Sequence, residues 1–214
     1  MLGKAFMLAV EGAIGVGKTS LARLIAERID ARLVLEEFDE NPFLTDFYRD
    51  SQKFAFQTQL WFLLARYRQQ QDLQQLDLFA PLVVTDYMFM KDRLFASLTL
   101  NDREMALYDR VAGLLERDIS TPDLVLFLQS DTNRLMENVM ERGRSYETRI
   151  EWQYLDSLNH LYNDFFFRFD KCPLLIINTN DIDFVANPDD LDQIIAFIRK
   201  PVSGTRFFNP ATSR

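Results

Sequence analysis

Residues 12–19 read Gly12-Ala13-Ile14-Gly15-Val16-Gly17-Lys18-Thr19, which is a complete GxxxxGK[ST] motif. Glycines let the backbone turn so that successive N–H groups point inward at phosphate oxygens. The helix that follows such a loop directs its positive N-terminal end at the same anion. Lys18 supplies a mobile positive charge for the outer phosphates, and the Thr19 hydroxyl is placed to bind Mg²⁺. The motif therefore predicts a loop that holds the phosphates of a nucleotide.

The residues around the motif have the pattern that such a loop requires. An apolar, β-favouring run at 5–10 comes before it, and a stretch of helical periodicity at 19–29 comes after it. The alternative is a glycine-rich turn that binds no nucleotide. The strand–loop–helix order argues against that alternative, because it is the context in which the motif works.

Apolar runs alternate with helical stretches along the rest of the chain. Strands are predicted at 5–10, 32–35, 82–85, 123–128 and 173–178, and helices at 19–29, 52–78, 101–117, 132–142, 150–169 and 189–199. This alternation predicts an α/β fold with a five-stranded parallel sheet flanked by helices on both faces. We expect one domain over residues 1–200. The segment 201–214 lacks a periodic pattern and is predicted to be a tail.

Composition excludes several classes of protein. The chain has 214 residues and a net charge of −8, whereas nucleic-acid binding favours a basic face. One cysteine and one histidine cannot form a disulfide framework or a zinc site. No apolar run approaches the roughly 18 residues of a membrane span, and no signal segment opens the chain. We therefore expect a cytoplasmic protein with no nucleic-acid or membrane partner.

Carboxylates follow the second and third predicted strands. Glu36 and Glu37 come directly after the run at 32–35, and Asp86 ends the run at 82–85. The carboxyl ends of parallel strands lie at one edge of the sheet, so these acids should meet Lys18 there. Asp86 is expected to hold Mg²⁺ or its waters, with a simple strand-end turn as the alternative. Glu36 is placed to act as a base, whereas Glu37 can face solvent because neighbouring residues alternate in direction.

A basic loop is predicted between two helices. Residues 141–149 read Glu-Arg-Gly-Arg-Ser-Tyr-Glu-Thr-Arg. Arginines on a mobile lid can stabilise the oxygens of a transferring phosphoryl group. The alternative is an ordinary solvated loop, and the presence of the phosphate motif in the same chain favours the lid.

With these motifs the chain resembles the deoxynucleoside kinases, in particular the bacterial deoxyguanosine and deoxyadenosine kinases. The resemblance runs from about residue 6 to residue 198, and its strength lies in the order and spacing of the motifs. The stretches that carry it are 11–19, 36–43, 54–59, 64–68, 85–87, 95–96 and 141–147.

The resemblance implies a deoxynucleoside site. Gln59 would pair with the edge of the base, and Arg66 and Asp92 would be the polar groups beside it. Tyr48 and Glu147 match the pair that holds the sugar 3′-hydroxyl. A homodimer is also implied.

The resemblance further implies how the reacting groups are arranged. Glu36 matches the carboxylate that takes the proton from the 5′-hydroxyl, and Arg142 and Arg144 match the lid arginines. The loop at 180–184 lies where the family encloses the adenine of ATP.

Three departures from the family pattern stand out. Glu37 occupies a position where many members have proline, and the stretch 86–95 is spaced one residue differently from some members. Tyr87 stands where many members have an arginine that contacts the 5′-oxygen. The sequence does not identify a residue that takes over this arginine's role.

These inferences predict transfer of a phosphoryl group from ATP, with Mg²⁺, to the 5′-hydroxyl of a 2′-deoxynucleoside. Deoxyguanosine or deoxyadenosine is favoured, although the amide of Gln59 can also pair with a pyrimidine.

Two other functions fit the sequence less well. A nucleoside monophosphate kinase such as thymidylate kinase is disfavoured, because its charged acceptor would face Glu36 and the uncharged Tyr87. A nucleotide-operated switch would need an NKxD-like motif, and residues 178–181, Asn-Thr-Asn-Asp, lack the lysine.

Overall fold

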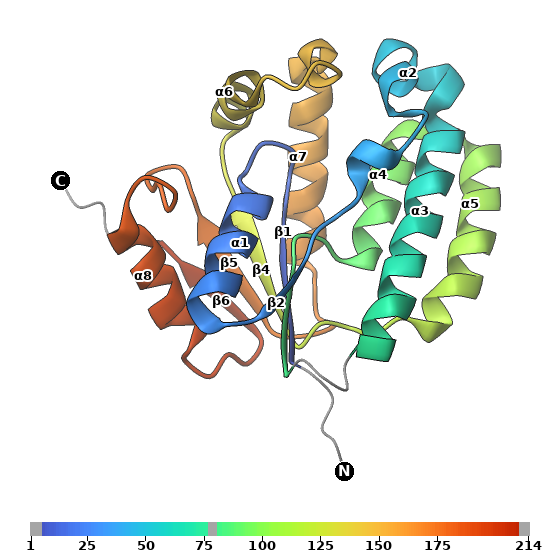
Figure 1. Cartoon of the computed structure of the whole chain (residues 1–214). Helices are drawn as coiled ribbons and strands as arrows, with labels where there is room; N and C mark the ends of the chain where they lie inside the picture. Colours follow the sequence, from blue (N-terminus) through green and yellow to red (C-terminus); the bar gives the residue numbers. More distant parts are fainter. Residues whose placement is uncertain (1–5, 77–80, 210–214) are drawn as a thin grey trace.

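A parallel sheet in the order β2-β3-β1-β4-β5-β6 forms the centre of the molecule (Figure 1). The structure is a computed structural model that describes residues 6–76 and 81–209. Its strands are β1 Phe6–Gly12, β2 Arg32–Val34, β3 Leu82–Thr85, β4 Leu124–Gln129, β5 Leu174–Asn178 and β6 Thr205–Phe208. The first five confirm the predicted strands, and the predicted strand residue Ala5 lies outside the described residues. The central strand β1 is buried from Met7 onward, as expected for a sheet covered on both faces.

The sheet has six strands, so the prediction of five was wrong. The sixth, β6, comes from the segment that the sequence predicted to be a tail. It pairs in parallel with β5, from Leu174 opposite Thr205 to Ile177 opposite Phe208. Three of its four residues are exposed, so it lacks the apolar run that marks a buried strand. Backbone hydrogen bonding at a sheet edge leaves no such pattern in the sequence. Residues 210–214 of the predicted tail lie outside the described residues.

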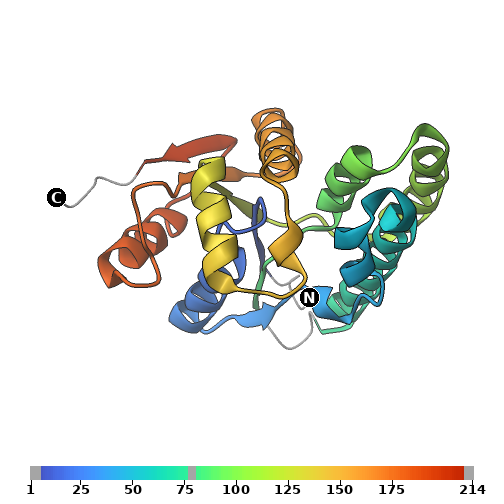
Figure 2. The same ribbon diagram turned by 90° about the horizontal axis from the view of Figure 1, so that it is seen from above.

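Helices cover both faces of the sheet. Helices α1 (Lys18–Ile29) and α8 (Pro188–Ile198) lie on one face, and α7 (Trp152–Phe167) lies on the other, as Figure 2 shows from above in blue, red and orange. On the α7 face, the ring of Phe166 stacks on Phe127 of β4 with their centroids 4.3 Å apart. The predicted doubly wound arrangement is therefore confirmed.

The remaining helices stand at the carboxyl edge and to one side of the sheet. Helix α6 (Thr132–Arg142) crosses above the strand ends. To the side stand α2 (Leu44–Arg49), α3 (Ser51–Leu76), α4 (Asp92–Thr99) and α5 (Asp102–Leu115). The prediction missed α2 and α4, whose six and eight residues are too few for a clear period. The predicted end of α3, Leu78, lies outside the described residues.

Local signals set the start of two helices. Asn101 precedes α5, and its side chain accepts hydrogen bonds from the N–H groups of Arg103 and Glu104, while the Glu104 carboxylate accepts one from the Asn101 N–H. This reciprocal arrangement satisfies N–H groups that a helix start otherwise leaves unpaired. At the start of α8 the Asn187 side chain accepts the N–H of Asp189, and Pro188 occupies the first helical position.

No helix in the described part of the chain is both long and apolar enough to cross a membrane.

Strand β6 should contribute to stability through one of its two phenylalanines. Phe208 packs against Phe197 of α8 with ring centroids 4.8 Å apart, whereas Phe207 is 64% exposed. We expect Phe208→Ala to lower the free energy of unfolding by about 1–2 kcal/mol, since a half-buried ring loses less than a fully buried one. Phe207→Ala is the matched control and should change it by less than about 0.5 kcal/mol. Urea unfolding measures both, and equal losses would mean that β6 does not pack as described.

Candidate active site

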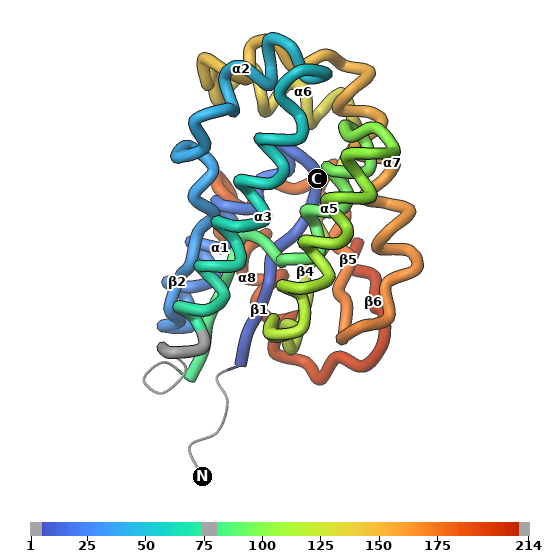
Figure 3. Tube along the Cα trace, turned by 90° about the vertical axis from the view of Figure 1, so that its right-hand side faces the viewer, coloured from blue at the N-terminus to red at the C-terminus, as the bar shows by residue number. Residues whose placement is uncertain are grey.

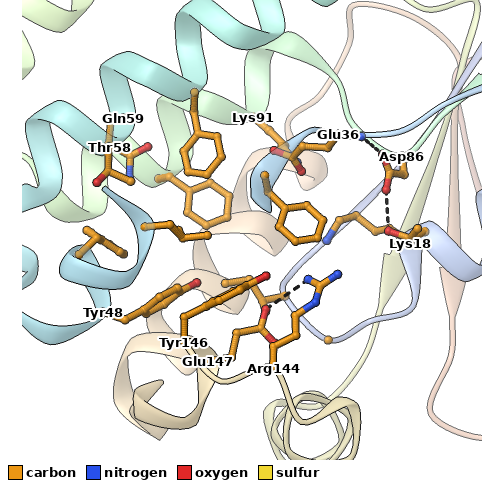
Figure 4. Close-up of a pocket in the computed structure, with 18 of the residues that line it drawn as sticks. Lys18, Glu36, Tyr48, Thr58, Gln59, Asp86, Lys91, Arg144, Tyr146 and Glu147 are labelled. Carbon is orange, nitrogen blue, oxygen red and sulfur yellow. Dashed lines mark hydrogen bonds and ion pairs between the residues drawn. The ribbon is translucent and has the colours of Figure 1, made fainter. Parts of the chain in front are cut away.

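A pocket opens at the carboxyl edge of the sheet, where the sequence placed its candidate residues. Its wall is formed by the phosphate loop, the segment after β2, helices α2 to α4, and the loop between α6 and α7 (Figure 4). Predicted residues that line it are Ile14, Gly15, Lys18, Thr19, Glu36, Tyr48, Gln59, Arg66, Asp86, Arg142, Arg144 and Glu147. The 3₁₀ turn η4 (Glu147–Arg149), in the loop that follows α6, contacts α2 at this edge. Segments that are far apart in the sequence therefore meet at one site.

The phosphate loop has the conformation that the motif predicts. Gly15 and Gly17 have φ angles of 86° and 94°, which residues with side chains rarely adopt. A Cβ on Gly15 would lie 2.5 Å from the carbonyl oxygen of Leu135, so packing also excludes a side chain there. The Lys18 ammonium donates to the carbonyls of Gly12 and Ala13 at 2.9 and 3.0 Å. The loop thus curls around the lysine, with Val16 buried beneath it.

Asp86 links the phosphate loop to the segment after β2. Its Oδ2 accepts the hydroxyl of Thr19 at 2.5 Å, and its Oδ1 accepts the backbone N–H of Glu36 at 2.7 Å. A hydroxyl beside a carboxylate offers the oxygen ligands that Mg²⁺ prefers, usually completed by substrate phosphates. In the described residues no group of three or more His, Cys, Asp or Glu side chains is arranged to hold a metal. The Thr19–Asp86 pair therefore fits a magnesium ion that binds together with a nucleotide.

Glu36 lies between two buried cations. Its carboxylate accepts from Arg66, and the Lys91 ammonium donates to its Oε2 at 2.5 Å. Arg66 forms a second ion pair with Asp92. Burial alone would raise the pKa of Glu36, but the charges of Arg66 and Lys91 lower the pKa to about 2. Glu36 is therefore an ionised acceptor at neutral pH.

Lys91 was not identified from the sequence. It is 3% exposed, and it lies in the short 3₁₀ turn η2 (Phe89–Lys91) that follows β3. Burial lowers the pKa of Lys18 to about 8, and the nearby charge of Lys91 adds to this effect. A lysine between Met90 and Asp92 carries no sequence signal of its own, because only the fold brings it to Glu36. Tyr87, which stands in place of the family arginine, is fully buried.

The far end of the pocket is mainly aromatic. Phe47, Phe62, Phe95 and Tyr154 line it, and the Arg66 guanidinium lies 4.8 Å from the centre of the Phe62 ring. Gln59 is buried there, and its Nε2 donates to the hydroxyl of Thr99 at 3.3 Å. Asp92 does not itself line the pocket but is buried behind Arg66. A flat, largely apolar group with a few polar edges fits this space.

The lid loop, residues 141–149, closes one side of the pocket. Arg142 donates from Nη2 to both carboxylate oxygens of Glu147, at 2.7 and 2.6 Å, and from Nε to Oε2 at 3.1 Å. Arg144 also approaches Glu147, at 3.5 Å, and its guanidinium lies 4.0 Å from the centre of the Phe38 ring. The predicted lid arginines and Glu147 are thus held as one unit.

Tyr48 stands beside this unit. Its ring stacks on that of Tyr146 with centroids 6.1 Å apart, and the Tyr146 hydroxyl donates to Asp39 at 2.6 Å. Burial raises the pKa of Tyr48 well above its ordinary value, so its hydroxyl keeps its proton and can act as a donor. Tyr48 and Glu147 both line the pocket.

A second, open pocket adjoins the outer side of the phosphate loop. The loop at 179–185 forms one wall, and the Arg134 guanidinium holds it by donating to the carbonyls of Asn180 and Ile182. Phe184 packs against Gly17, where an added Cβ would lie 2.9 Å from its ring. A nucleotide with its phosphates in the loop can extend its base into this second pocket.

Comparison with known proteins identifies a family that this chain matches over most of its length. The family model described as deoxynucleoside kinase matches residues 8–203. Among curated proteins, the chain is 29% identical to deoxyguanosine kinase of Bacillus subtilis, over 93% of this chain and 99% of that protein. It is 30% identical to deoxyadenosine kinase of Dictyostelium discoideum, over 94% of this chain and 81% of that protein.

Solved structures give the same fold. A deoxyadenosine kinase from M. mycoides with bound dATP has a TM-score of 0.78 and 21% identity, covering 91% of this chain and all of that one. The same enzyme with dCTP bound has a TM-score of 0.77.

The ionisation of Glu36 predicts how stability depends on pH. The pKa of Glu36 falls from the ordinary 4.5 to about 2 in the folded chain. Its charge therefore stabilises the fold above pH 4.5, and this contribution is lost as the pH falls toward 2. Urea unfolding of the chain and of Glu36→Gln should show a stability difference that shrinks by on the order of 2 kcal/mol between pH 7 and pH 3. A difference that is the same at both pH values would contradict the ion-pair geometry.

Proposed function

Because this chain belongs to the deoxynucleoside kinase family, we propose that it transfers the γ-phosphoryl group of ATP to the 5′-hydroxyl of a purine 2′-deoxynucleoside. The products are the deoxynucleoside 5′-monophosphate and ADP, as in nucleotide salvage. The proposal depends above all on one observation, that Glu36 and Lys18 line the same pocket. A phosphate-binding cation and an ionised acceptor for a hydroxyl proton are the two groups that this reaction needs.

The phosphate loop and its neighbours would hold the donor. Loop amides and Lys18 bind the phosphates, exchanging the carbonyl contacts of Lys18 for phosphate oxygens. Thr19 and Asp86 would hold Mg²⁺, which neutralises charge on the phosphates when it is bound. Arg142 and Arg144 would stabilise the charge that develops on the transferred group.

Glu36 would orient the 5′-hydroxyl and accept its proton. With a pKa of about 2, Glu36 is a weak base but a fully ionised hydrogen-bond acceptor. Phosphoryl transfer passes through a loose transition state in most analyses, so the hydroxyl needs orientation more than early deprotonation. The proton moves to Glu36 as the new O–P bond forms.

The acceptor end of the pocket suits a deoxynucleoside. Gln59 would pair with the base between the aromatic walls, next to the Arg66–Asp92 pair. Tyr48 and Glu147 would hold the 3′-hydroxyl. The purine preference is taken from the relatives named for deoxyguanosine and deoxyadenosine, and a pyrimidine nucleoside is the alternative substrate.

Charge balance argues against a monophosphate acceptor. The two cations nearest the acceptor, Arg66 and Lys91, are already neutralised by Glu36 and Asp92. A phosphate entering beside Glu36 would meet that carboxylate, and the two cations that contact it are already balanced by it and by Asp92. A neutral sugar alcohol encounters no such repulsion.

A substrate panel tests this function. The purified protein with ATP and Mg²⁺ should phosphorylate deoxyguanosine or deoxyadenosine faster than thymidine or deoxycytidine, and it should not phosphorylate their monophosphates. Glu36→Gln should bind ADP normally and lower turnover at least about a hundredfold, the usual scale for loss of a positioned base. Turnover of monophosphates, or a Glu36→Gln variant as active as the wild type, would reject the proposal.

We also propose that the chain forms a homodimer through α3 and α5. These helices pack side by side and face the viewer in Figure 3. Leu64, Leu107 and Leu114 on them are 44%, 50% and 65% exposed. Three large apolar side chains on one pair of helices are typical of a covered face. The cytoplasm is the expected location, where the single Cys172 remains a free thiol.

Negative charges introduced on this face should dissociate the dimer. Leu107 and Leu114 are seven residues apart and so lie on one side of α5. We expect the double substitution Leu107→Glu, Leu114→Glu to convert a dimer to a monomer in sedimentation velocity. Phe167→Glu on α7, at an 81% exposed position, is the control and should leave the mass unchanged. A wild-type chain that sediments as a monomer would refute the dimer.

A further inference from the structure

We propose that Lys91 is the positioning residue for Glu36, holding its carboxylate where the acceptor hydroxyl must bind. The inference rests on the proposed function, because it assigns a role within that reaction. Many relatives carry an arginine at the position of Tyr87, which is buried and uncharged in this chain. Lys91 supplies a positive charge beside Glu36 that Tyr87 cannot supply.

The contact is direct and buried. Lys91 Nζ donates to Oε2 of Glu36 at 2.5 Å, while Arg66 approaches the other oxygen, Oε1. Lys91 is 3% exposed, so water competes little with this bond. Each carboxylate oxygen therefore has its own cation. Because these two contacts come from different elements, together they hold the Glu36 side chain in one orientation.

The two cations are not equivalent. Arg66 divides its guanidinium between Glu36 and Asp92, whereas the Lys91 ammonium forms its ion pair with Glu36. Lys91 also lines the pocket beside Lys18 and Asp86, as Figure 4 shows. An ammonium has three donors, so Lys91 can retain Glu36 while the acceptor oxygen enters.

Lys91 is itself held by the phosphate-loop strand. Glu11, the buried residue that precedes the motif, accepts the backbone N–H of Met88 at 2.6 Å and that of Gly12 at 3.2 Å. Its carboxylate therefore ties the segment after β3 to the start of the phosphate loop. The 3₁₀ turn that follows, η2, then carries Lys91 to Glu36. The position of Lys91 is thus set relative to the same loop that would bind the donor.

A double-mutant cycle tests this role. Lys91→Met should lower kcat roughly 30-fold, with KM for the deoxynucleoside and the Kd for ADP changed less than about threefold. If Lys91 acts through Glu36, adding Lys91→Met to Glu36→Gln should change kcat by less than about twofold. Lys91→Arg keeps the charge and should remain within about fivefold of the wild-type kcat.

Arg93→Met is the matched control. Arg93 is a nearby cation on α4, but its side chain is 64% exposed and pairs with Asp109, away from the pocket. Its loss should leave kcat unchanged. Urea unfolding checks that each variant is folded, and Lys91→Gln replaces Lys91→Met if the latter does not fold.

The outcomes separate this inference from the proposed function. If the wild type phosphorylates none of the nucleosides, the proposed function fails. If the wild type is active, three results each overturn the role of Lys91: Lys91→Met with wild-type kcat, full additivity with Glu36→Gln, or a loss in Lys91→Arg equal to that in Lys91→Met.

Discussion

The candidate site depends on four buried charges that neutralise one another. Glu36, Arg66, Lys91 and Asp92 come from the end of β2, from α3, from η2 and from α4. Removal of one member leaves another buried charge without compensation, and a lone buried charge strongly destabilises the folded state. The cluster therefore joins the side helices to the sheet and sets the electrostatics of the pocket at the same time.

This cluster also explains the arrangement of the surrounding elements. The sheet fixes Lys18, Glu36 and Asp86 at one edge, because parallel strands end there. The helices beside the sheet must then approach closely enough for Arg66 to contact Glu36. The pocket lies between these helices and the strand ends, and Phe47, Phe62 and Phe95 of the helices form part of its apolar wall.

The sequence predicted the parts of the site that a local pattern determines. The spacing of the glycines and the lysine predicts the phosphate loop. The positions of Glu36 and Asp86 directly after strands predict that they lie at the same edge of the sheet. The Arg66–Glu36 and Lys91–Glu36 contacts could not be read in this way, since residues 30 and 55 positions apart meet only in the fold. The lid arginines were found from composition, but their pairing with Glu147 was not. Strand β6 was missed because it is short, exposed and held by backbone bonds.

The resemblance to a family supplied roles that residue chemistry alone left open. Glutamine can pair with any base edge, so Gln59 gained its interpretation from the resemblance. Where the chain departs from the family, at Tyr87, the resemblance gave no answer. For this position we propose Lys91, the buried cation whose ion-pair partner is Glu36.

The pairing of Arg142 with Glu147 has a consequence for how two substrates influence each other. Both residues belong to one short loop, and each holds the other until a ligand intervenes. In the proposed reaction, a sugar that engages Glu147 would release the Arg142 guanidinium, and an anion that attracts Arg142 would release the Glu147 carboxylate. Occupancy of one half of the pocket then favours occupancy of the other, so the two ligands should bind with positive cooperativity.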